Sequence, residues 1–163
     1  MADLLVRLYD LPAGSPAIGA LAGQGIGVRR AMASERAAVV EWMRANGSAG
    51  WAGECEAAFA RLPLACFVAV AEQRPPADRL IGVACYEATC RNFFGPELVH
   101  PDWRGRGIGR ALLLSALESM RAEGYAYAII GWAASVDFYR RAAGAVPIEG
   151  SSPGIYPVAP LSR

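Results

Sequence analysis

The sequence contains no lysine and only one histidine, His100. Because the phosphate-binding motif of a P-loop, GxxxxGK[ST], requires a lysine, that class of nucleotide site is excluded. A histidine-rich metal site is excluded as well, and we expect no bound metal. All 16 basic residues are arginine, and the abundance of alanine and glycine favours a biased genome composition as the reason.

Cysteine is scarce, and its four copies follow no recognisable pattern. Cys55, Cys66, Cys85 and Cys90 lack the CxxC spacing of metal and redox sites, and Cys66 and Cys85 lie within apolar runs. This favours free thiols in the core and a reducing compartment. No apolar run is long enough to span a bilayer, and the N-terminus lacks a basic region followed by an apolar stretch. We therefore expect a cytoplasmic protein without membrane contact.

An excess of charge of either sign is also lacking. The formal net charge is +1, charged residues make up 19% of the chain, and the arginines form no basic stripe. This disfavours nucleic acid as a partner. Hydrophobic residues make up 54% of the 163 residues, which excludes general disorder and predicts a single domain over residues 1–163.

Apolar patterns and turn residues divide the chain into short elements. We expect helices over 34–47, 51–61, 111–123 and 135–143, and strands over 4–9, 28–31, 64–72, 80–89, 93–99, 125–132, 145–148 and 155–158. The last two strands are predicted to form a hairpin, Gly95-Pro96 predicts a bulge, and strand 125–132 is expected to be buried on both faces. Residues 1–27 are predicted to form an arm, packed on the domain or on a second subunit of a homodimer.

The functional interpretation depends mainly on the stretch that follows strand 93–99. Three glycines and three arginines are interleaved there: Arg104, Gly105, Arg106, Gly107, Gly109 and Arg110. Glycines let a ligand approach the backbone, and the first N–H groups of the helix that follows attract anions. Arginine adds charge-assisted bonds to phosphate oxygens. A Rossmann loop fits less well, because its GxGxxG spacing differs and it occurs at the first strand-to-helix turn.

The segment Arg104-Gly105-Arg106-Gly107-Ile108-Gly109 fits the pattern Q/R-x-x-G-x-G/A and resembles the pyrophosphate loop of the GNAT superfamily, the acyl-CoA-dependent N-acyltransferases. Phe138-Tyr139 followed by Gly144-Ala145 is similar to a second family element, with one extra residue before the glycine and alanine in place of an aromatic residue. The asparagine that many members carry just before this element is missing, and Trp132-Ala133-Ala134 stands there. The resemblance is strongest over residues 80–148 and weak over residues 1–50.

The resemblance implies an α/β (α+β) fold, in which a mixed, mostly antiparallel sheet contains a splayed parallel strand pair and carries helices on both faces. It also implies an N-acetyltransferase that moves an acetyl group from acetyl-CoA to a primary amine by direct attack in a ternary complex. A small amine, an amino acid, an antibiotic and a protein N-terminus all stay open as acceptors. The alternative is a non-catalytic CoA-binding regulatory or interaction protein.

Nine residues are the cofactor contacts expected from the resemblance: Leu98, Val99, Arg104, Gly105, Arg106, Gly107, Ile108, Gly109 and Arg110. A backbone N–H near Val99 could also stabilise the oxyanion that forms during transfer. Trp51 falls in the region where relatives gather their acceptor pocket, and it could line that pocket here.

The chemistry of acyl transfer requires two further groups. An attacking amine must be neutral, so a base is needed, and a phenol could protonate the departing thiolate. Tyr139 is the expected acid and Glu97 the expected base, with Glu87 and Glu54 as alternatives. His100 could titrate near neutral pH, although a lone loop histidine is more often part of the surface.

Overall fold

The computed structural model describes residues 1–155. In this range the chain forms seven strands: β1 (Leu4–Arg7), β2 (Ile26–Arg30), β3 (Cys66–Ala71), β4 (Leu80–Tyr86), β5 (Phe93–Val99), β6 (Tyr127–Ile130) and β7 (Val146–Pro147). It forms five α-helices there: α1 (Ser15–Ala22), α2 (Arg36–Asn46), α3 (Ala49–Phe59), α4 (Ile108–Ala122) and α5 (Val136–Ala143). The element order predicted from residue 28 to residue 148 is confirmed.

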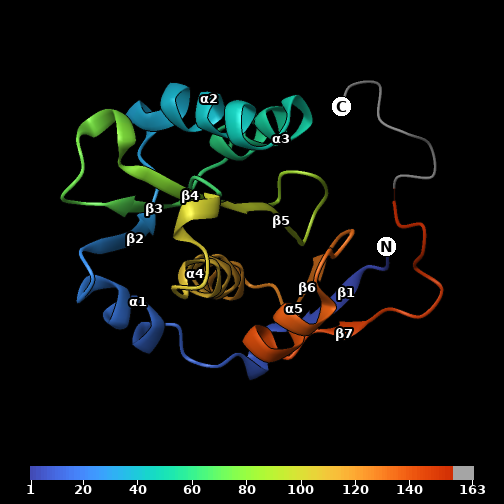
Figure 1. The fold of residues 1–163 in the computed structure, drawn as a ribbon. Coiled ribbons are helices and arrows are strands. Elements are labelled where there is room, and N and C mark those ends of the chain that lie inside the picture. The colour runs from blue at the N-terminus through green and yellow to red at the C-terminus, as the bar shows by residue number, and fades with distance from the viewer. Residues whose placement is uncertain (156–163) are drawn as a thin grey trace.

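All seven strands belong to one sheet with the order β2-β3-β4-β5-β6-β1-β7. Neighbouring strands are antiparallel except β5 and β6, which run parallel. Helices α2 and α3 cover one face of the sheet, and α1, α4 and α5 cover the other (Figure 1). The predicted fold class, a mostly antiparallel mixed sheet between two helical layers, is confirmed.

The parallel pair separates soon after it forms. Only Phe93 and Phe94 of β5 pair with β6, opposite Ile129 and Ile130. Strand β5 then continues along β4 to Val99, with a register shift that confirms the predicted bulge at Gly95-Pro96. The edge of β5 that faces β6 is therefore open beyond residue 94, which leaves a gap in the sheet next to the glycine-rich loop.

The N-terminal segment has a more central place than the sequence suggested. Residues 1–27 were expected to form an arm, but β1 lies inside the sheet between β6 and β7, where Leu4 is opposite both Ile130 and Pro147. Helix α1 was not expected either, because its alanine- and glycine-rich sequence has no clear apolar stripe. Pro16 in its first turn is the local signal for a helix start.

Helix α4 is the central helix of the second layer. The apolar stripe that predicts it is fully buried, and Leu114, Ser115 and Ala116 on its other sides are buried too. This follows from its neighbours, because α1 and α5 flank α4 while the sheet lies behind it. The helix ends at Ala122, and Gly124 follows the C-cap residue Glu123 with a φ of +97°, the left-handed conformation expected just after a helix end.

Two predictions for the last third of the chain need correction. Strand β6 is not buried on both faces, because Tyr127 is 44% exposed and stacks edge-on against Tyr9 at the surface. Strand β7 pairs with β1, so within residues 1–155 its partner comes from the N-terminus. The second strand of the predicted hairpin, 155–158, lies outside the described residues except for Ile155, which is not in a strand.

Three cysteines meet in the core between α3, β3 and β4. Cys55, Cys66 and Cys85 are buried with free thiols, and the sulfur atoms of Cys55 and Cys85 are 3.5 Å apart. Hydrogen bonding to the two neighbouring thiols, together with burial, raises the pKa of Cys85. The predicted free core thiols are confirmed for these three residues, whereas Cys90 is exposed.

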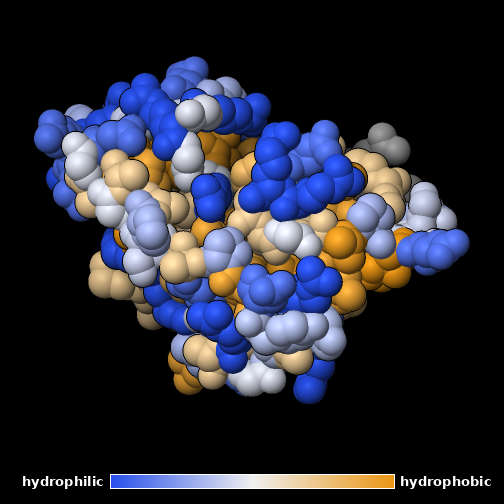
Figure 2. Space-filling view, turned by 90° about the horizontal axis from the view of Figure 1, so that it is seen from below, coloured by the Kyte–Doolittle hydropathy of each residue, from blue (hydrophilic) through white to orange (hydrophobic). Residues whose placement is uncertain are grey.

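The surface of the α1, α4 and α5 layer is mostly hydrophilic, and hydrophobic residues gather toward the side where β1 and β7 lie in Figure 1 (Figure 2). Val146 of β7 and Ile155 are among the exposed hydrophobic residues. The homodimer suggested from the sequence stays a prediction.

In the described part of the chain, no helix combines the length and apolar character needed to cross a bilayer.

Candidate active site

The loop between β5 and α4 has the backbone geometry of a ligand cradle. After a short turn at Pro101–Trp103, Gly105 and Gly107 take φ values of +78° and +89°, which side-chain-bearing residues rarely adopt. A Cβ atom built at either glycine would meet nothing within 4 Å. Packing within the protein therefore does not explain these glycines, and the space beside them is open to a ligand.

Helix α4 begins directly behind this loop. Gly107 is its N-cap residue, and no side chain caps the first N–H groups. Uncapped N–H groups and the helix dipole together favour an anion at this position. The loop and the helix start therefore suit an anion, and the binding of a pyrophosphate there stays a prediction.

The three loop arginines are exposed but differ in their contacts. Arg104 donates from Nε to the carbonyl oxygen of Val99 at 3.1 Å, which ties the loop to the end of β5. Arg106 places its guanidinium 4.7 Å from the ring centre of Trp103 and lines a separate cavity of about 410 Å³ that also contains His100. Arg110 lies in the first turn of α4.

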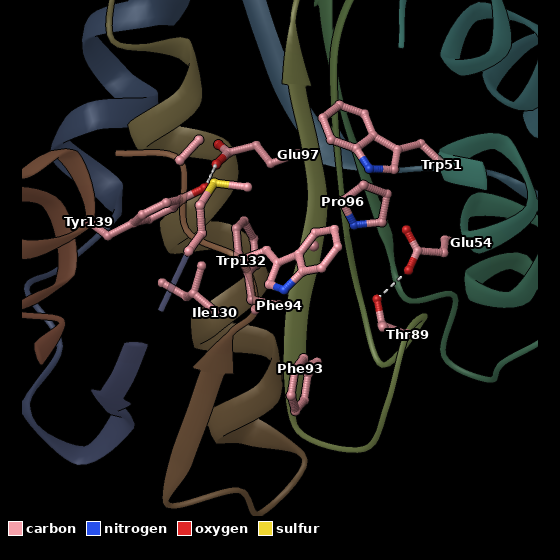
Figure 3. A pocket seen from close by; sticks show the side chains of 14 residues that line it. Trp51, Glu54, Thr89, Phe93, Phe94, Pro96, Glu97, Ile130, Trp132 and Tyr139 are labelled. Carbon is pink, nitrogen blue, oxygen red and sulfur yellow. Dashed lines mark hydrogen bonds between the residues drawn. The ribbon is translucent and has the colours of Figure 1, made fainter. Parts of the chain in front are cut away.

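A pocket of about 260 Å³ lies where β5 and β6 separate (Figure 3). Five parts of the chain line it: the N-terminus, α3, the β4–β5 turn, β5, and the segment from β6 into α5. The lining residues are Met1, Trp51, Glu54, Thr89, Phe93, Phe94, Gly95, Pro96, Glu97, Ile130, Gly131, Trp132, Ala134 and Tyr139. Both predicted catalytic residues are among them.

Glu97 and Tyr139 form a pair inside this pocket. The Tyr139 hydroxyl donates to Glu97 Oε2 at 3.5 Å, and the Tyr139 ring is held edge-on against Phe94 and Phe138. Although Glu97 as a whole residue is half-buried, its Oε1 is inaccessible to solvent and has no hydrogen-bond partner among residues 1–155. A Cβ at Gly109 would lie 3.4 Å from this oxygen, so the carboxylate reaches the first turn of α4.

The environment perturbs both groups strongly. Burial raises the pKa of Glu97 from 4.5 to about 8, although the hydrogen bond from Tyr139 lowers it. Burial also raises the pKa of Tyr139 well above its usual value, and the nearby Glu97 charge adds to this effect. A carboxyl group with a pKa near neutrality beside a phenol that keeps its proton is typical of acid–base sites.

The structure separates the alternative bases. Glu54 of α3 lines the pocket and accepts a hydrogen bond from Thr89 Oγ1 at 2.5 Å. Glu87 lies outside the pocket, where it pairs with Arg61 at 3.2 Å and accepts from the backbone N–H of Asn92, so its role is structural. His100 also lies outside and accepts from the backbone N–H of Asp102 at 3.3 Å.

Sequence reasoning missed two contributors to the pocket. Trp132, which stands where the family's usual asparagine is missing, lines the pocket in a left-handed conformation with a φ of +49°. The buried side chain of Asp3 holds it there by accepting the Trp132 backbone N–H on Oδ1 at 3.0 Å. The indole Nε1 of Trp132 donates to the carbonyl oxygen of Pro153. No local sequence pattern predicts the contact between Asp3 and Trp132, because the two residues are 129 positions apart.

No group of three or more histidine, cysteine, aspartate or glutamate side chains in residues 1–155 is arranged to hold a metal ion.

Known proteins are similar to this chain in fold, and a family model matches its middle part. Residues 64–142 match the family described as an acetyltransferase (GNAT) domain. A fungal structure, a GCN5-related glucosamine N-acetyltransferase region of a multi-domain GH3 β-N-acetylglucosaminidase, superposes with a TM-score of 0.71 at 17% identity, covering 90% of this chain and 19% of that one. A GCN5-related N-acetyltransferase from Sphaerobacter thermophilus gives a TM-score of 0.62 at 18% identity, covering 90% and 48%.

The present chain spans less than half the length of each of these two structures. No curated protein matches the sequence. The matched core, the splayed β5–β6 pair and the glycine-rich helix start agree with one another: residues 64–142 are similar to a GNAT acetyltransferase domain in sequence, and the chain has the fold of such domains.

Proposed function

We propose that this protein transfers an acetyl group from acetyl-CoA to a primary amine by direct attack in a ternary complex. One observation carries the proposal: the Glu97–Tyr139 pair lies in a pocket at the gap between β5 and β6, and the Glu97 carboxylate borders the same helix turn that is suited to bind phosphate. The turn proposed to bind the donor and the pair proposed to transfer the proton are therefore adjacent.

Acetyl-CoA supplies the activated acyl group as its thioester. Its pyrophosphate fits the cradle of Arg104, Gly105, Gly107 and Gly109 and the open N–H groups of α4, with Arg106, Ile108 and Arg110 completing the contact. The free edge of β5 at Leu98 and Val99 offers backbone groups for the amide-bearing arm. Binding far from the reacting carbon positions the thioester at the pocket.

Glu97 and Tyr139 then move one proton from amine to sulfur. Glu97 accepts the proton of the attacking amine, and Tyr139 gives its own proton to the departing sulfur. Because the two side chains are hydrogen-bonded, the proton on Glu97 can pass to Tyr139 in the same event. For a neutral amine, one N–H bond and the thioester C–S bond are broken, one C–N bond and one S–H bond are formed, and both side chains return to their starting state. An amine that arrives as an ammonium releases one further proton to solvent.

The pKa of Glu97 sets the expected pH dependence. With a pKa of about 8, the carboxyl group of the free enzyme is mostly protonated at pH 7 and becomes a base as pH rises. We therefore expect kcat/KM to increase with pH and to level off above about pH 8, since the base must be ionised.

Two assays test this proposal separately. Calorimetry should show that CoA binds far more tightly than pantetheine, which lacks the pyrophosphate. Equal affinities would contradict the assignment of the loop as the pyrophosphate site. A panel of amines offered with acetyl-CoA should then give free thiol in an amine-dependent manner. Tight CoA binding without any such release would instead identify a non-catalytic CoA-binding protein.

A further inference from the structure

The side of the pocket toward α3 presents an exposed tryptophan. Trp51 lines the pocket and is 39% exposed, and Figure 3 shows it extending from α3 toward β5, where Pro96 lies. Glu97 and Tyr139 lie on the other side of β5. Met1 lines the same pocket, together with the β4–β5 turn and the segment from β6 into α5. An indole in this position would offer an acceptor amine a broad contact surface.

The backbone of Trp51 is fixed by the cap of α3. Ser48 is the N-cap residue of this helix, and its hydroxyl oxygen accepts a hydrogen bond from the backbone N–H of Trp51 at 3.1 Å. This bond sets where the Cα atom of Trp51 lies, but it does not choose the rotamer of the side chain. The direction of the indole must therefore depend on what the ring packs against.

The ring packs against the turn between α2 and α3. A Cβ atom built at Gly47 would lie 2.9 Å from Cε3 of Trp51 and 3.4 Å from Cδ2 of Leu98. Real Cβ atoms essentially never approach another atom to less than 3.0 Å. The indole thus occupies space that any side chain at position 47 would need, at a point where the turn also approaches Leu98 of β5.

The end of α2 offers a second reason for a glycine at this position. Gly47 is the C-cap residue of α2 and donates its N–H to the carbonyl oxygen of Met43 at 2.9 Å, and the built Cβ would lie 2.9 Å from that oxygen too. Its φ of −119° is not the left-handed conformation that usually explains a glycine at a helix end. The two reasons differ in one testable way, because only the first depends on Trp51.

We propose that Gly47 is a positioning residue. Because it has no side chain, the indole of Trp51 lies against the α2–α3 turn, and this contact fixes the wall that the acceptor amine meets. The inference rests on the proposed acetyl transfer and adds to it a residue that does not itself line the pocket. In a pocket of about 260 Å³, displacing the indole by the size of a methyl group changes the fit of the acceptor.

Fluorine NMR measures the position of the indole without any need for catalysis. The chain has four tryptophans, and after labelling with 5-fluorotryptophan each signal is assigned by its loss in the matching Trp→Phe variant. Gly47→Ala should shift the Trp51 signal and leave those of Trp103 and Trp132 in place. Gly53→Ala is the matched control, because a Cβ at this exposed position of α3 meets nothing within 4 Å. An unmoved Trp51 signal in Gly47→Ala would overturn the inference.

A double-mutant cycle separates the indole from the rest of the turn. Benzylamine, putrescine, lysine and glucosamine are offered with acetyl-CoA, and thiol release identifies the amine that reacts fastest. Gly47→Ala should raise KM for this amine by about fivefold to tenfold at constant CoA affinity. In a Trp51→Ala background the same substitution should change KM by less than about twofold. A shift of the whole of α3, or the contact with Met43, would act equally in both backgrounds and would contradict the positioning role.

A titration decides the case in which none of the four amines is acetylated. Each amine is added to the labelled wild-type protein in the presence of CoA, and at least one should shift the Trp51 signal. If none does so, Trp51 does not form the wall that an acceptor meets, and the inference is wrong. CoA binding is measured on the same samples, and its absence would count against the proposed function, whereas the effect of Gly47→Ala on the Trp51 signal is read on the free protein.

Folding itself supplies the test if Gly47→Ala does not give a stable protein. The double variant Gly47→Ala/Trp51→Ala removes the ring that the new methyl group would meet, so it should fold and melt close to Trp51→Ala alone. If the double variant also fails to fold, the carbonyl oxygen of Met43 is the reason for the glycine, and the inference is overturned.

Discussion

The loop at residues 104–110 and the pocket beside it are built in opposite ways. The loop is one continuous segment whose function follows from backbone conformation, two left-handed glycines and an uncapped helix start. The pocket is assembled from five separate parts of the chain, and its chemistry follows from burial. The proposed donor site is therefore a property of local sequence, whereas the proposed acceptor site is a property of the whole fold.

This difference predicts how the two regions respond to substitution. Changes in the loop should weaken CoA and leave proton transfer intact, because the loop holds the part of the donor remote from the reacting carbon. Changes in the pocket should alter turnover or acceptor binding and leave CoA affinity intact. Each variant below is a test of that division.

The largest effect is expected for Glu97→Gln. Removing the base should lower kcat by about 100-fold or more, with CoA affinity changed little. The folded protein also keeps a proton on Glu97 that the unfolded chain releases, since its pKa is about 8 instead of 4.5. The unfolding free energy of the wild type should therefore fall between pH 4.5 and pH 8, by at most about 1.4 kcal/mol per pH unit.

The Gln variant should lack that pH-dependent contribution. Denaturant titrations at several pH values measure the slope for both proteins. If turnover survives while the slope disappears, Glu97 is a buried acid without a catalytic role, and another group must accept the proton.

A smaller loss is expected for Tyr139→Phe. The substitution keeps the ring against Phe94 and Phe138 and removes only the hydroxyl, so turnover should fall about 100-fold at constant CoA affinity. Tyr127→Phe serves as the control, since that tyrosine is at the surface. Unchanged turnover would mean that water protonates the thiolate, and a loss of melting temperature instead would make the hydroxyl structural.

The loop should respond in the opposite manner to Arg104→Met. Loss of one charge-assisted contact, together with the bond to the Val99 carbonyl, should weaken CoA by roughly tenfold or somewhat more and leave pantetheine binding unchanged. Arg121→Met removes the same charge from the far end of α4 and should have no effect. A fall in kcat with normal CoA affinity would break the division between donor and acceptor regions.

The smallest effect is expected for Asp3→Ala. Without the Oδ1 acceptor, the left-handed conformation of Trp132 loses its hydrogen bond, and KM for the amine should rise by roughly threefold to tenfold with kcat nearly constant. Asp3→Asn keeps an acceptor oxygen and should restore the wild-type KM. If Asn fails to rescue, the charge of Asp3 matters and the positioning role is incorrect.

The sequence predicts what depends on neighbouring residues. The apolar stripe of α4, the helix predicted over 135–143 and the glycine-rich turn before α4 are all local, and the structure agrees with each of them. Glu97 and Tyr139 could be predicted as candidate catalytic residues because each lies within or beside a motif. Their 3.5 Å contact, however, depends on how α5 packs against β5.

What the sequence could not predict depends on distant pairing. Strand β1 pairs with β6 and β7 through partners at least 120 residues away, and no local pattern specifies that choice. The same holds for Asp3 and Trp132. The raised pKa of Glu97 could not be predicted from the sequence either. It arises from the desolvation of the carboxylate, and on an isolated strand this side chain would be exposed to water.

The pH dependence of amine-driven thiol release tests the central claim most directly. Free thiol and N-acetylated amine should form in equal amounts, and kcat/KM should rise with pH to a plateau above about pH 8, as ionisation of Glu97 requires. The rise should be absent from the residual activity of the Glu97→Gln variant. Thiol release that is independent of added amine, or an unchanged profile in the variant, would contradict acetyl transfer through the Glu97–Tyr139 pair.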